Sequence, residues 1–469
     1  MKKITGLILA LSVLLMSAGC GDNSSEKEKS AADEEVKTTS FSEETVAPSE
    51  PETTVPPEPE TAAQTEPEGE APTEQITTAE STTETSEQTN KTEFLSVNKK
   101  LLYDNEWSEE YGMTLAEFEC SSILLGDEDA KRYPELAKAL ASDGDMYEVN
   151  LLGEYDMFVS DAEQILASGS QVFDPLVSTL DVHVRRADNT VLSLLYDSYY
   201  YNGMNDGSRS FWGGNYDTQT GKVIYLPDVV TDMEELAEVA EAQLFSDFGA
   251  EVFYSDTVIE DYFKDYGADG THWTIEYNGI TVYFSEGEIA GSGVGDISVT
   301  IEFEDYPELF NEKYTAVPEA YIVGLPMKST FYTDLDGDGS SDKLALFDSY
   351  DEEFAWNATL TIATDEVDYN ESFSAYGCEP YYVKTADGRH YIYLFTELET
   401  QTELYTYAIT NTTISKVGEQ SISPYYSDQT VSVLTDPDNM HFDIFGNADV
   451  EPVGDDFFTV GYDGMPVMK

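Results

Sequence analysis

The residue types and spacing most suited to chemistry belong to one short segment, residues 334–342, which reads DLDGDGSSD. When such a segment coils tightly, its alternate carboxylates converge on one point, and the glycine in the sixth position permits the sharp turn. The seventh residue can add a backbone carbonyl and the ninth a further carboxylate. Hard oxygen ligands in this arrangement select Ca²⁺. We therefore predict a structural calcium site made by Asp334, Asp336, Asp338, Ser340 and Asp342; the alternative is a polar turn in an aspartate-rich chain.

The surroundings of this segment indicate what kind of calcium loop it is. Its twelfth position is Ala345, where an EF-hand has a bidentate glutamate, and strand-like residues lie on both sides, at 330–332 and 343–347. The segment therefore resembles the calcium loops of FG-GAP and related β repeats rather than a loop between two helices. Sites of this kind outside the cell are often weak, on the order of 10⁻⁴ to 10⁻³ M.

Candidate catalytic groups are few. None of the four histidines, His183, His272, His390 and His441, is paired at the spacing of an HExxH motif, and no GxSxG elbow occurs. Carboxylate pairs cannot be singled out, because so many acidic residues make chance pairs certain. The sequence thus names no catalytic residue and favours a protein that is not an enzyme.

Aromatic residues are the remaining candidates for recognition. Four tyrosines gather at 196–201, before a loop rich in Gly, Asn and Asp, and Trp212 follows that loop. Aromatic faces beside carboxylates can stack on sugars or hold cationic side chains. Tyr200 and Trp212 are therefore candidate ligand-binding residues, although alternate positions in this run are expected to be core.

The start of the chain resembles a bacterial lipoprotein signal. Lys2 and Lys3 precede an apolar run at 4–16, and Ser17, Ala18 and Gly19 lead to Cys20. In that family the cysteine is lipidated and becomes the mature N-terminus; Ser17 departs from the usual aliphatic residue. We expect a signal peptide at 1–20 and a lipid on Cys20 that holds the protein at the outer face of the bacterial cytoplasmic membrane. An ordinary cleaved signal is the alternative.

Residues 21–97 have the composition of a long disordered linker. Between 21 and 93 there are 20 Asp and Glu, four Lys and one aromatic, Phe41, and Thr, Pro and Ser fill most of the rest. Such a segment cannot bury enough apolar surface to offset the entropy lost on ordering. We expect it to be an extended acidic tether.

Charge narrows the range of partners. The 469 residues include 93 Asp and Glu against 23 Lys and Arg, a formal net charge of -70. Such a polyanion repels phosphate, which excludes nucleic acid as a partner bound through its backbone. Excess negative charge speeds encounters with cationic partners, or it simply keeps the protein soluble.

Hydrophobic periodicity divides the rest into two folded regions, 98–316 and 317–469. The first region contains both strand-like and helix-like hydrophobic periodicity. Strands are expected at 113–124, 177–184, 191–196, 221–226 and 298–303, with a hairpin around Asn278-Gly279. Helices are expected at 130–140, at 151–165 and after a capping box at 231–234. The second reads as strands, the clearest at 359–363, 381–383, 390–395 and 403–409. The predicted fold class is an α+β domain followed by a mostly β domain.

Three pieces between about 130 and 312 resemble a family of bacterial envelope domains called DUF3298, often preceded by a segment called DUF4163. They are the strand-turn-strand at 212–229, the hairpin at 278–284 and the glycine loop at 288–295. The family's Gly-Gly-Ala-His element is not evident, since 202–207 occupies that place without a histidine.

This resemblance implies a membrane-tethered protein, because the family includes the outer part of an anti-sigma factor that binds lysozyme. The favoured function is a lipid-anchored, non-catalytic binding or sensing module for a cell-wall component or a cationic protein such as lysozyme. A wall-active hydrolase that uses carboxylates and a passive surface spacer are the alternatives.

Overall fold

The computed structural model describes residues 92–469, apart from gaps at 170–173, 204–206, 328–329, 339, 341, 352–354, 376, 399–401, 423–429 and 443–456. The predicted signal, Cys20 and the linker up to residue 91 lie outside the described residues. The fold begins before the predicted linker end at 97, because Phe94 bridges to Asp188 and Leu95 is buried. The described residues belong to one compact unit, so the two predicted folded regions, 98–316 and 317–469, share it.

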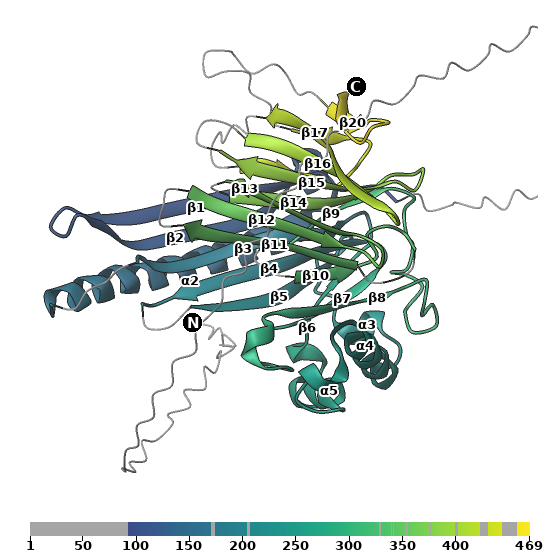
Figure 1. Ribbon diagram of the computed structural model, residues 1–469, viewed down its shortest axis with the longest axis horizontal. Coiled ribbons are helices and arrows are strands. Elements are labelled where there is room, and N and C mark those ends of the chain that lie inside the picture. The colour runs from purple at the N-terminus through teal and green to yellow at the C-terminus, as the bar shows by residue number, and fades with distance from the viewer. Residues whose placement is uncertain are drawn as a thin grey trace, which may run out of the picture. The chain divides into compact units, whose positions relative to one another are not determined.

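The first sheet has six strands in the order β18-β1-β2-β3-β4-β5 (Figure 1). Its neighbours are antiparallel except β2 and β3, which run parallel. Strand β18 comes last along the chain among the strands of this sheet, and it pairs with β1, which comes first. Val97 lies opposite Val433 in this pair. The strands are β1 Val97–Ser108, β2 Met113–Leu125, β3 Leu176–Ala187, β4 Val191–Tyr201, β5 Ser208–Asp217 and β18 Thr430–Val433.

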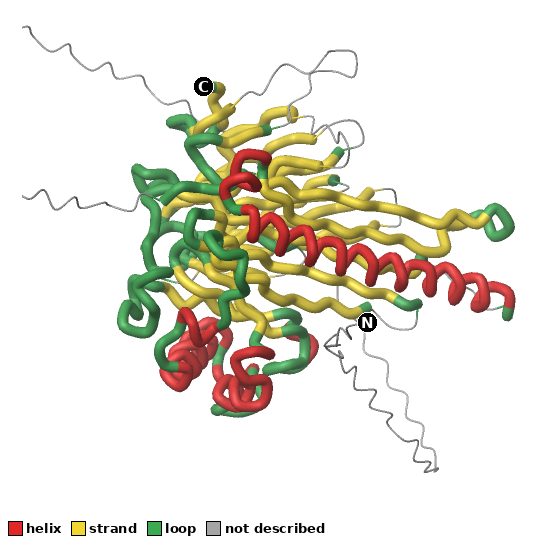
Figure 2. Tube along the Cα trace, turned by 180° about the vertical axis from the view of Figure 1, so that it is seen from behind, coloured by secondary structure: helices red, strands yellow, loops and turns green. Residues whose placement is uncertain are grey.

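A long helix, α2 (Pro134–Ala167), connects the parallel strands β2 and β3 and follows the short α1 (Asp127–Arg132). Parallel neighbours need such a crossover, and Pro134 suits the first helical position, where no N–H is needed. The helix packs across β2 and β3 (Figure 2) and buries one face. The helical stretch expected at 151–165 lies within α2, whereas the one expected at 130–140 covers the end of α1 and the start of α2, with a break at Tyr133. Its buried residues are Leu136, Leu140, Leu151, Tyr155, Phe158 and Ala162.

A second layer combines helices with the three-stranded second sheet, β6-β7-β8. The expected hairpin between β6 and β7 is confirmed, but its two turn residues are Tyr277 and Asn278, because Gly279 already belongs to β7 and its carbonyl accepts from the N–H of Glu276. The expected strand at 221–226 is wrong, because only Val223 makes an isolated bridge and α3 begins at Leu226. The helix expected after 231 is confirmed, but its cap is Asp232, which accepts from the N–H groups of Glu234 and Glu235. The elements are α3 Leu226–Val229, α4 Met233–Phe248, α5 Val258–Gly270, β6 His272–Ile275, β7 Gly279–Phe284 and β8 Ile297–Glu302.

The C-terminal part is mostly β, as predicted. The third sheet has the order β10-β11-β12-β13, the fourth β17-β16-β15-β14-β9, and the small fifth β19-β20-β21. Their bounds are β9 Tyr321–Gly324, β10 Thr330–Thr333, β11 Asp342–Asp351, β12 Ala355–Ala363, β13 Asp368–Ser374, β14 Gly377–Lys384, β15 His390–Glu397, β16 Thr402–Thr410, β17 Thr413–Ile422, β19 Met440–His441, β20 Phe457–Val460 and β21 Pro466–Met468.

The fourth sheet is buried on both faces. Because side chains alternate along a strand, Tyr382 and Ile392 pack with the third sheet, whereas Tyr381 and Tyr391 join the core of the first sheet and α2. The fourth sheet therefore ties the C-terminal strands to the N-terminal ones. Among the described residues, no helix combines the length and apolar content needed to cross a bilayer.

Candidate functional site

The predicted calcium segment lies at the corner of a hairpin in the third sheet. Strand β10 ends at Thr333 and β11 begins at Asp342, and these two residues are paired across the antiparallel ladder. The expectation that the segment lies between strands rather than helices is confirmed. The positive φ that makes the corner sharp is at Gly337, where φ is 83°; Gly339, the glycine assigned that role from sequence, lies outside the described residues.

Three of the predicted ligand residues come together. Asp334, Asp336 and Asp338 each offer a carboxylate oxygen within 4.8 Å of the others. Backbone N–H groups fold the loop around these side chains: Asp334 Oδ1 accepts from Gly337 at 2.6 Å, and Asp338 Oδ1 accepts from Ser340 at 2.8 Å. Like charges placed so close repel one another, so the arrangement has the donor type and the charge that a hard cation requires.

Asp342 lies beneath this cluster and is 2% exposed. Its Oδ2 accepts from the N–H of Leu335 at 2.8 Å and of Asp336 at 3.2 Å, whereas its buried Oδ1 has no hydrogen-bond partner. Burial, joined by the charges of the three loop aspartates, raises the pKa of Asp342 to about 7 although the Leu335 N–H acts in the opposite direction. An unpaired oxygen on a buried carboxyl is uncommon and calls for a ligand.

Three further side chains, those of His390, Tyr382 and Glu302, lie near the loop. A Cβ on Gly337 would come within 2.9 Å of Nε2 of His390, which is why glycine is needed there, and His390 Nδ1 lies 2.7 Å from the hydroxyl of Tyr382. Burial and the charge of Asp334 raise the pKa of Glu302 to about 7. Polar side chains from β8, β14 and β15 therefore lie next to the loop.

The predicted aromatic residues are part of the packing beneath α2. Trp212 stacks on Tyr196 with ring centroids 5.5 Å apart, and its Nε1 donates to the hydroxyl of Tyr147 at 2.9 Å. Tyr200 packs against Phe158, with ring centroids 4.9 Å apart. Both side chains are only partly buried, and their contacts are internal ones between helix and sheet.

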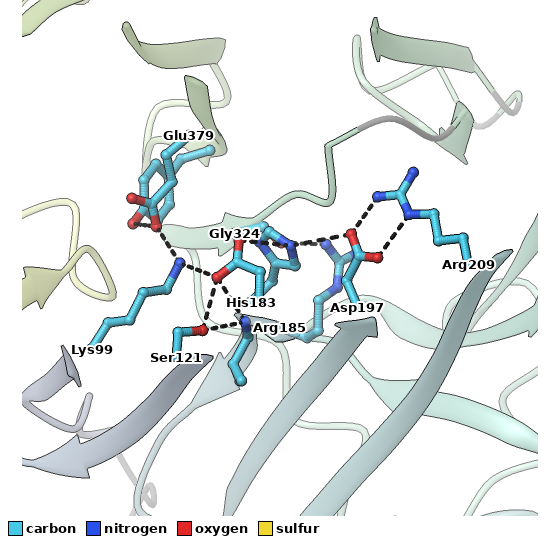
Figure 3. A network of polar contacts seen from close by, with 11 residues as sticks. Lys99, Ser121, His183, Arg185, Asp197, Arg209, Gly324 and Glu379 are labelled. Carbon is cyan, nitrogen blue, oxygen red and sulfur yellow. Dashed lines mark hydrogen bonds and ion pairs between the residues drawn. The ribbon is translucent and has the colours of Figure 1, made fainter. Parts of the chain in front are cut away.

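A line of alternating charges crosses the first sheet and reaches the fourth (Figure 3). Lys99 on β1 is nearly buried, and its Nζ lies 3.0 Å from Asp181 Oδ1 and 3.1 Å from Glu379 Oε1. His183 follows, with Nε2 at 3.4 Å from Asp181 and 3.9 Å from Asp197. Arg209 on β5 ends the line, since its Nε donates to Asp197 at 2.7 Å.

The contacts along this line shift the pKa values of Lys99 and Asp181 in opposite directions. Burial alone would lower the pKa of Lys99, but the carboxylates of Asp181 and Glu379 raise it above its ordinary value. Burial would raise the pKa of Asp181, but Lys99 and His183, with a hydrogen bond from Ser121, bring it well below its ordinary value. An ammonium held so firmly charged cannot act as a nucleophile or a general base, so the line serves structure and electrostatics.

Three residues of this line, Lys99, Asp181 and Glu379, also border a cleft with a volume of about 230 Å³ between the first and the fourth sheets. Its walls include Lys99 and Leu101 from β1, and Tyr381 and Phe395 from the fourth sheet. Carboxylates outnumber cations among its lining residues. The carboxylates belong to Glu119, Asp181, Glu379 and Glu397.

Sequence reasoning missed this cleft. Lys99 and Glu379 are 280 residues apart, and nothing in the spacing of isolated charges along five strands indicates that they meet. The one available signal was a lysine in an otherwise alternating strand at 97–102, where a cation on the buried face requires a partner.

The two cysteines among the described residues are Cys120 and Cys378, and Cys378 lines the cleft. Cys120 and Cys378 form no disulfide. Burial, joined by the charge of Glu148, raises the pKa of Cys120 to about 11, so its thiol is unreactive near neutral pH.

Comparisons with known proteins give fold neighbours alone. No protein-family model matches the sequence, and no curated protein matches it. Among solved structures, a DUF3298 family member from Bacteroides fragilis is similar, with 16% identity and a TM-score of 0.36 over 47% of this chain and 94% of that one. A DUF3298 family protein from Pseudomonas aeruginosa has 17% identity and a TM-score of 0.32 over 48% of this chain and 97% of that one.

Proposed function

We propose that this chain is a non-catalytic binding module, held by a lipid on Cys20 at the outer face of the bacterial cytoplasmic membrane, whose partner is a cationic protein. The observation that supports the proposal is the excess of carboxylates over the cations that could pair with them. Residues 94–469 contain 73 Asp and Glu against 17 Lys and Arg. Many of these cations are already held by carboxylates, namely Lys99, Lys100, Lys131, Arg132, Arg185, Arg186, Arg209, Lys264, Lys313, Arg389 and Lys416.

Cations that are buried or paired inside the fold offer little attraction to an anionic ligand. Arg185, for example, is fully buried against Glu276, and Arg186 pairs with Asp188 at 2.7 Å with both side chains buried. The carboxylates in excess face solvent and create a field that steers positively charged molecules to the surface. This supports a cationic protein over a neutral wall polymer, and lysozyme is a suitable probe.

The test uses the lipid-free full chain, titrated with lysozyme, with lysozyme whose lysines are acetylated, and with purified peptidoglycan. We expect saturable binding to lysozyme that acetylation abolishes. Binding to peptidoglycan alone would place the partner in the wall, and no binding to any of them would leave a passive spacer. Release of soluble fragments from labelled wall, lost in a single Asp or Glu variant, would contradict the non-catalytic assignment.

We further propose that the 334–342 loop binds one Ca²⁺. Three converging carboxylates and the unpaired Oδ1 of Asp342 support this, and Ser340 would add its backbone carbonyl. The ion would neutralise the cluster and fix the corner between β10 and β11, which is a structural role.

Calorimetric titration of the EGTA-treated full chain with Ca²⁺ tests this proposal. We expect one site with a dissociation constant on the order of 10⁻⁴ to 10⁻³ M, absent in Asp336→Asn. The matched control is Asp368→Asn, an exposed aspartate at the start of β13. Identical isotherms for the two variants would mean that the loop is an ordinary turn.

A further inference from the structure

The cleft between the first and the fourth sheets has the form of a small ligand site. It is lined from one side by Lys99, Leu101 and Glu119 and from the other by Tyr381, Phe395, Glu397 and Phe442. Its volume of about 230 Å³ is below the roughly 300–1,000 Å³ of pockets that take drug-sized ligands. One amino-acid side chain therefore suits it better than a saccharide.

The charges around the cleft select the sign of its occupant. The single ammonium, that of Lys99, is already within 3.1 Å of both Asp181 and Glu379. An anion would have to displace these carboxylates and would also meet Glu119 and Glu397, which are exposed. A cation would instead be attracted by the exposed carboxylates of Glu119 and Glu397, while Lys99 is already balanced by Asp181 and Glu379 and His441 also lines the cleft.

One wall of the cleft is aromatic. Phe395 lies against Tyr381 in an edge-to-face contact, with centroids 5.7 Å apart, and against Phe442 at 5.8 Å. Aromatic faces attract ammonium and guanidinium groups and pack against the methylene stems that carry them.

We propose that this cleft receives an arginine or lysine side chain of a cationic polypeptide partner. The stem lies along the aromatic wall formed by Tyr381, Phe395 and Phe442, and the charged head lies at the carboxylates of Glu119, Glu379 and Glu397. This inference rests on the proposed function, since it names the part of the partner that the module recognises.

The test uses the lipid-free full chain and two small probes of nearly the same shape, N-acetylarginine amide and its uncharged analogue N-acetylcitrulline amide. Ligand-observed NMR gives their affinities for the wild type, for Glu119→Gln/Glu397→Gln, and for the control Glu238→Gln/Glu304→Gln, whose glutamates are exposed outside the cleft. We expect the arginine probe to bind the wild type and the control alike, the citrulline probe not to bind, and the cleft variant to bind about tenfold more weakly. Equal affinities for the two probes, or for the two variants, would overturn the proposal.

The same variants separate this inference from the proposed function. If lysozyme binds the wild type and the cleft variant equally well, the cationic partner stands and the cleft is wrong. If the arginine probe binds through the cleft while lysozyme does not bind, the cleft stands and the proposed partner is wrong.

Discussion

At the scale of single residues, the fold places its cations where carboxylates surround them. Lys99 is the clearest case, because its side chain is 5% exposed and contacts Asp181 from β3 and Glu379 from β14. Breaking a buried pair by removing one partner leaves uncompensated charge behind, which costs more than the pair contributes.

Lys99→Met should therefore destabilise the protein by about 2–3 kcal/mol, below the full range for buried pairs because the two carboxylates are 37% and 33% exposed. Urea unfolding measures this. Lys131→Met, which removes an exposed pair with Glu128, should change the free energy of unfolding by less than about 0.5 kcal/mol. Equal effects of the two substitutions would contradict the role given to the buried line of charges.

The carboxyl group of Glu302 makes the free energy of unfolding depend on pH. The pKa of Glu302 is raised to about 7 in the folded protein, against roughly 4.3 for an unperturbed glutamate. Between these values the folded state binds more protons than the unfolded state, so the free energy of unfolding falls as pH rises to about 7 and is level above.

In Glu302→Gln with EGTA present, the fall in stability between pH 5 and pH 7 should be smaller but not absent, because burial also raises the pKa values of Asp342 and Asp247. Urea unfolding at several pH values checks this. The exposed neighbour provides the control, since Glu304→Gln should keep the wild-type slope. An unchanged slope in Glu302→Gln would show that its carboxyl does not titrate as described.

The contrast between the two sites shows what a sequence can predict at this scale. Asp334, Asp336 and Asp338 are neighbours in one loop, so their convergence follows from local spacing. Lys99 on β1 and Glu379 on β14 belong to different sheets, and they contact each other only because the first sheet packs against the fourth. No local sequence pattern contains that information. The sequence offers Tyr200 and Trp212 as candidate ligand-binding residues because the position of α2, whose Phe158 and Tyr147 contact them, does not follow from any local pattern.

At the scale of elements, strands were predicted better than helix limits. Alternation identified β3, β4, β15 and β16, and Asn278-Gly279 identified the β6–β7 hairpin. The helical stretches expected at 130–140 and 151–165 leave out residues 141–150, yet α2 runs through them. Its buried residues on both sides, from Leu136 to Ala162, pack on the first sheet and hold it together.

Two glycines within α2 allow a matched test of this element. A Cβ on Gly153 would meet nothing within 4 Å, whereas one on Gly144 would come within 3.1 Å of Ser122 Cβ. Gly153→Ala should therefore stabilise the protein by about 0.5–1 kcal/mol through helix propensity, and Gly144→Ala should gain less. Thermal unfolding compares them. A larger gain at Gly144 would contradict the packing of α2 on β2.

At the scale of the whole molecule, the C-terminal residues complete the N-terminal sheet. β18 pairs with β1, Thr435 Oγ1 donates to the carbonyl of Leu95, and Phe442 belongs to the same core cluster as Leu95. The two regions predicted from sequence, 98–316 and 317–469, should thus unfold together.

Phe442→Ala should shift one shared calorimetric transition downward, at a cost of about 3–5 kcal/mol. Phe457→Ala, in which the side chain is 39% exposed, should have a smaller effect. Two separate transitions, of which only one moves, would contradict the shared core.

If the negative charge of this module attracts a cationic partner, the rate constant for association of the module with lysozyme should depend on salt concentration. Stopped-flow fluorescence between about 20 and 200 mM NaCl would measure it, because screening shortens the reach of surface charge over this range. The rate constant should fall about tenfold or more while the dissociation rate changes little. A rate constant that stays level across this range, or no binding at the lowest salt, would contradict the account.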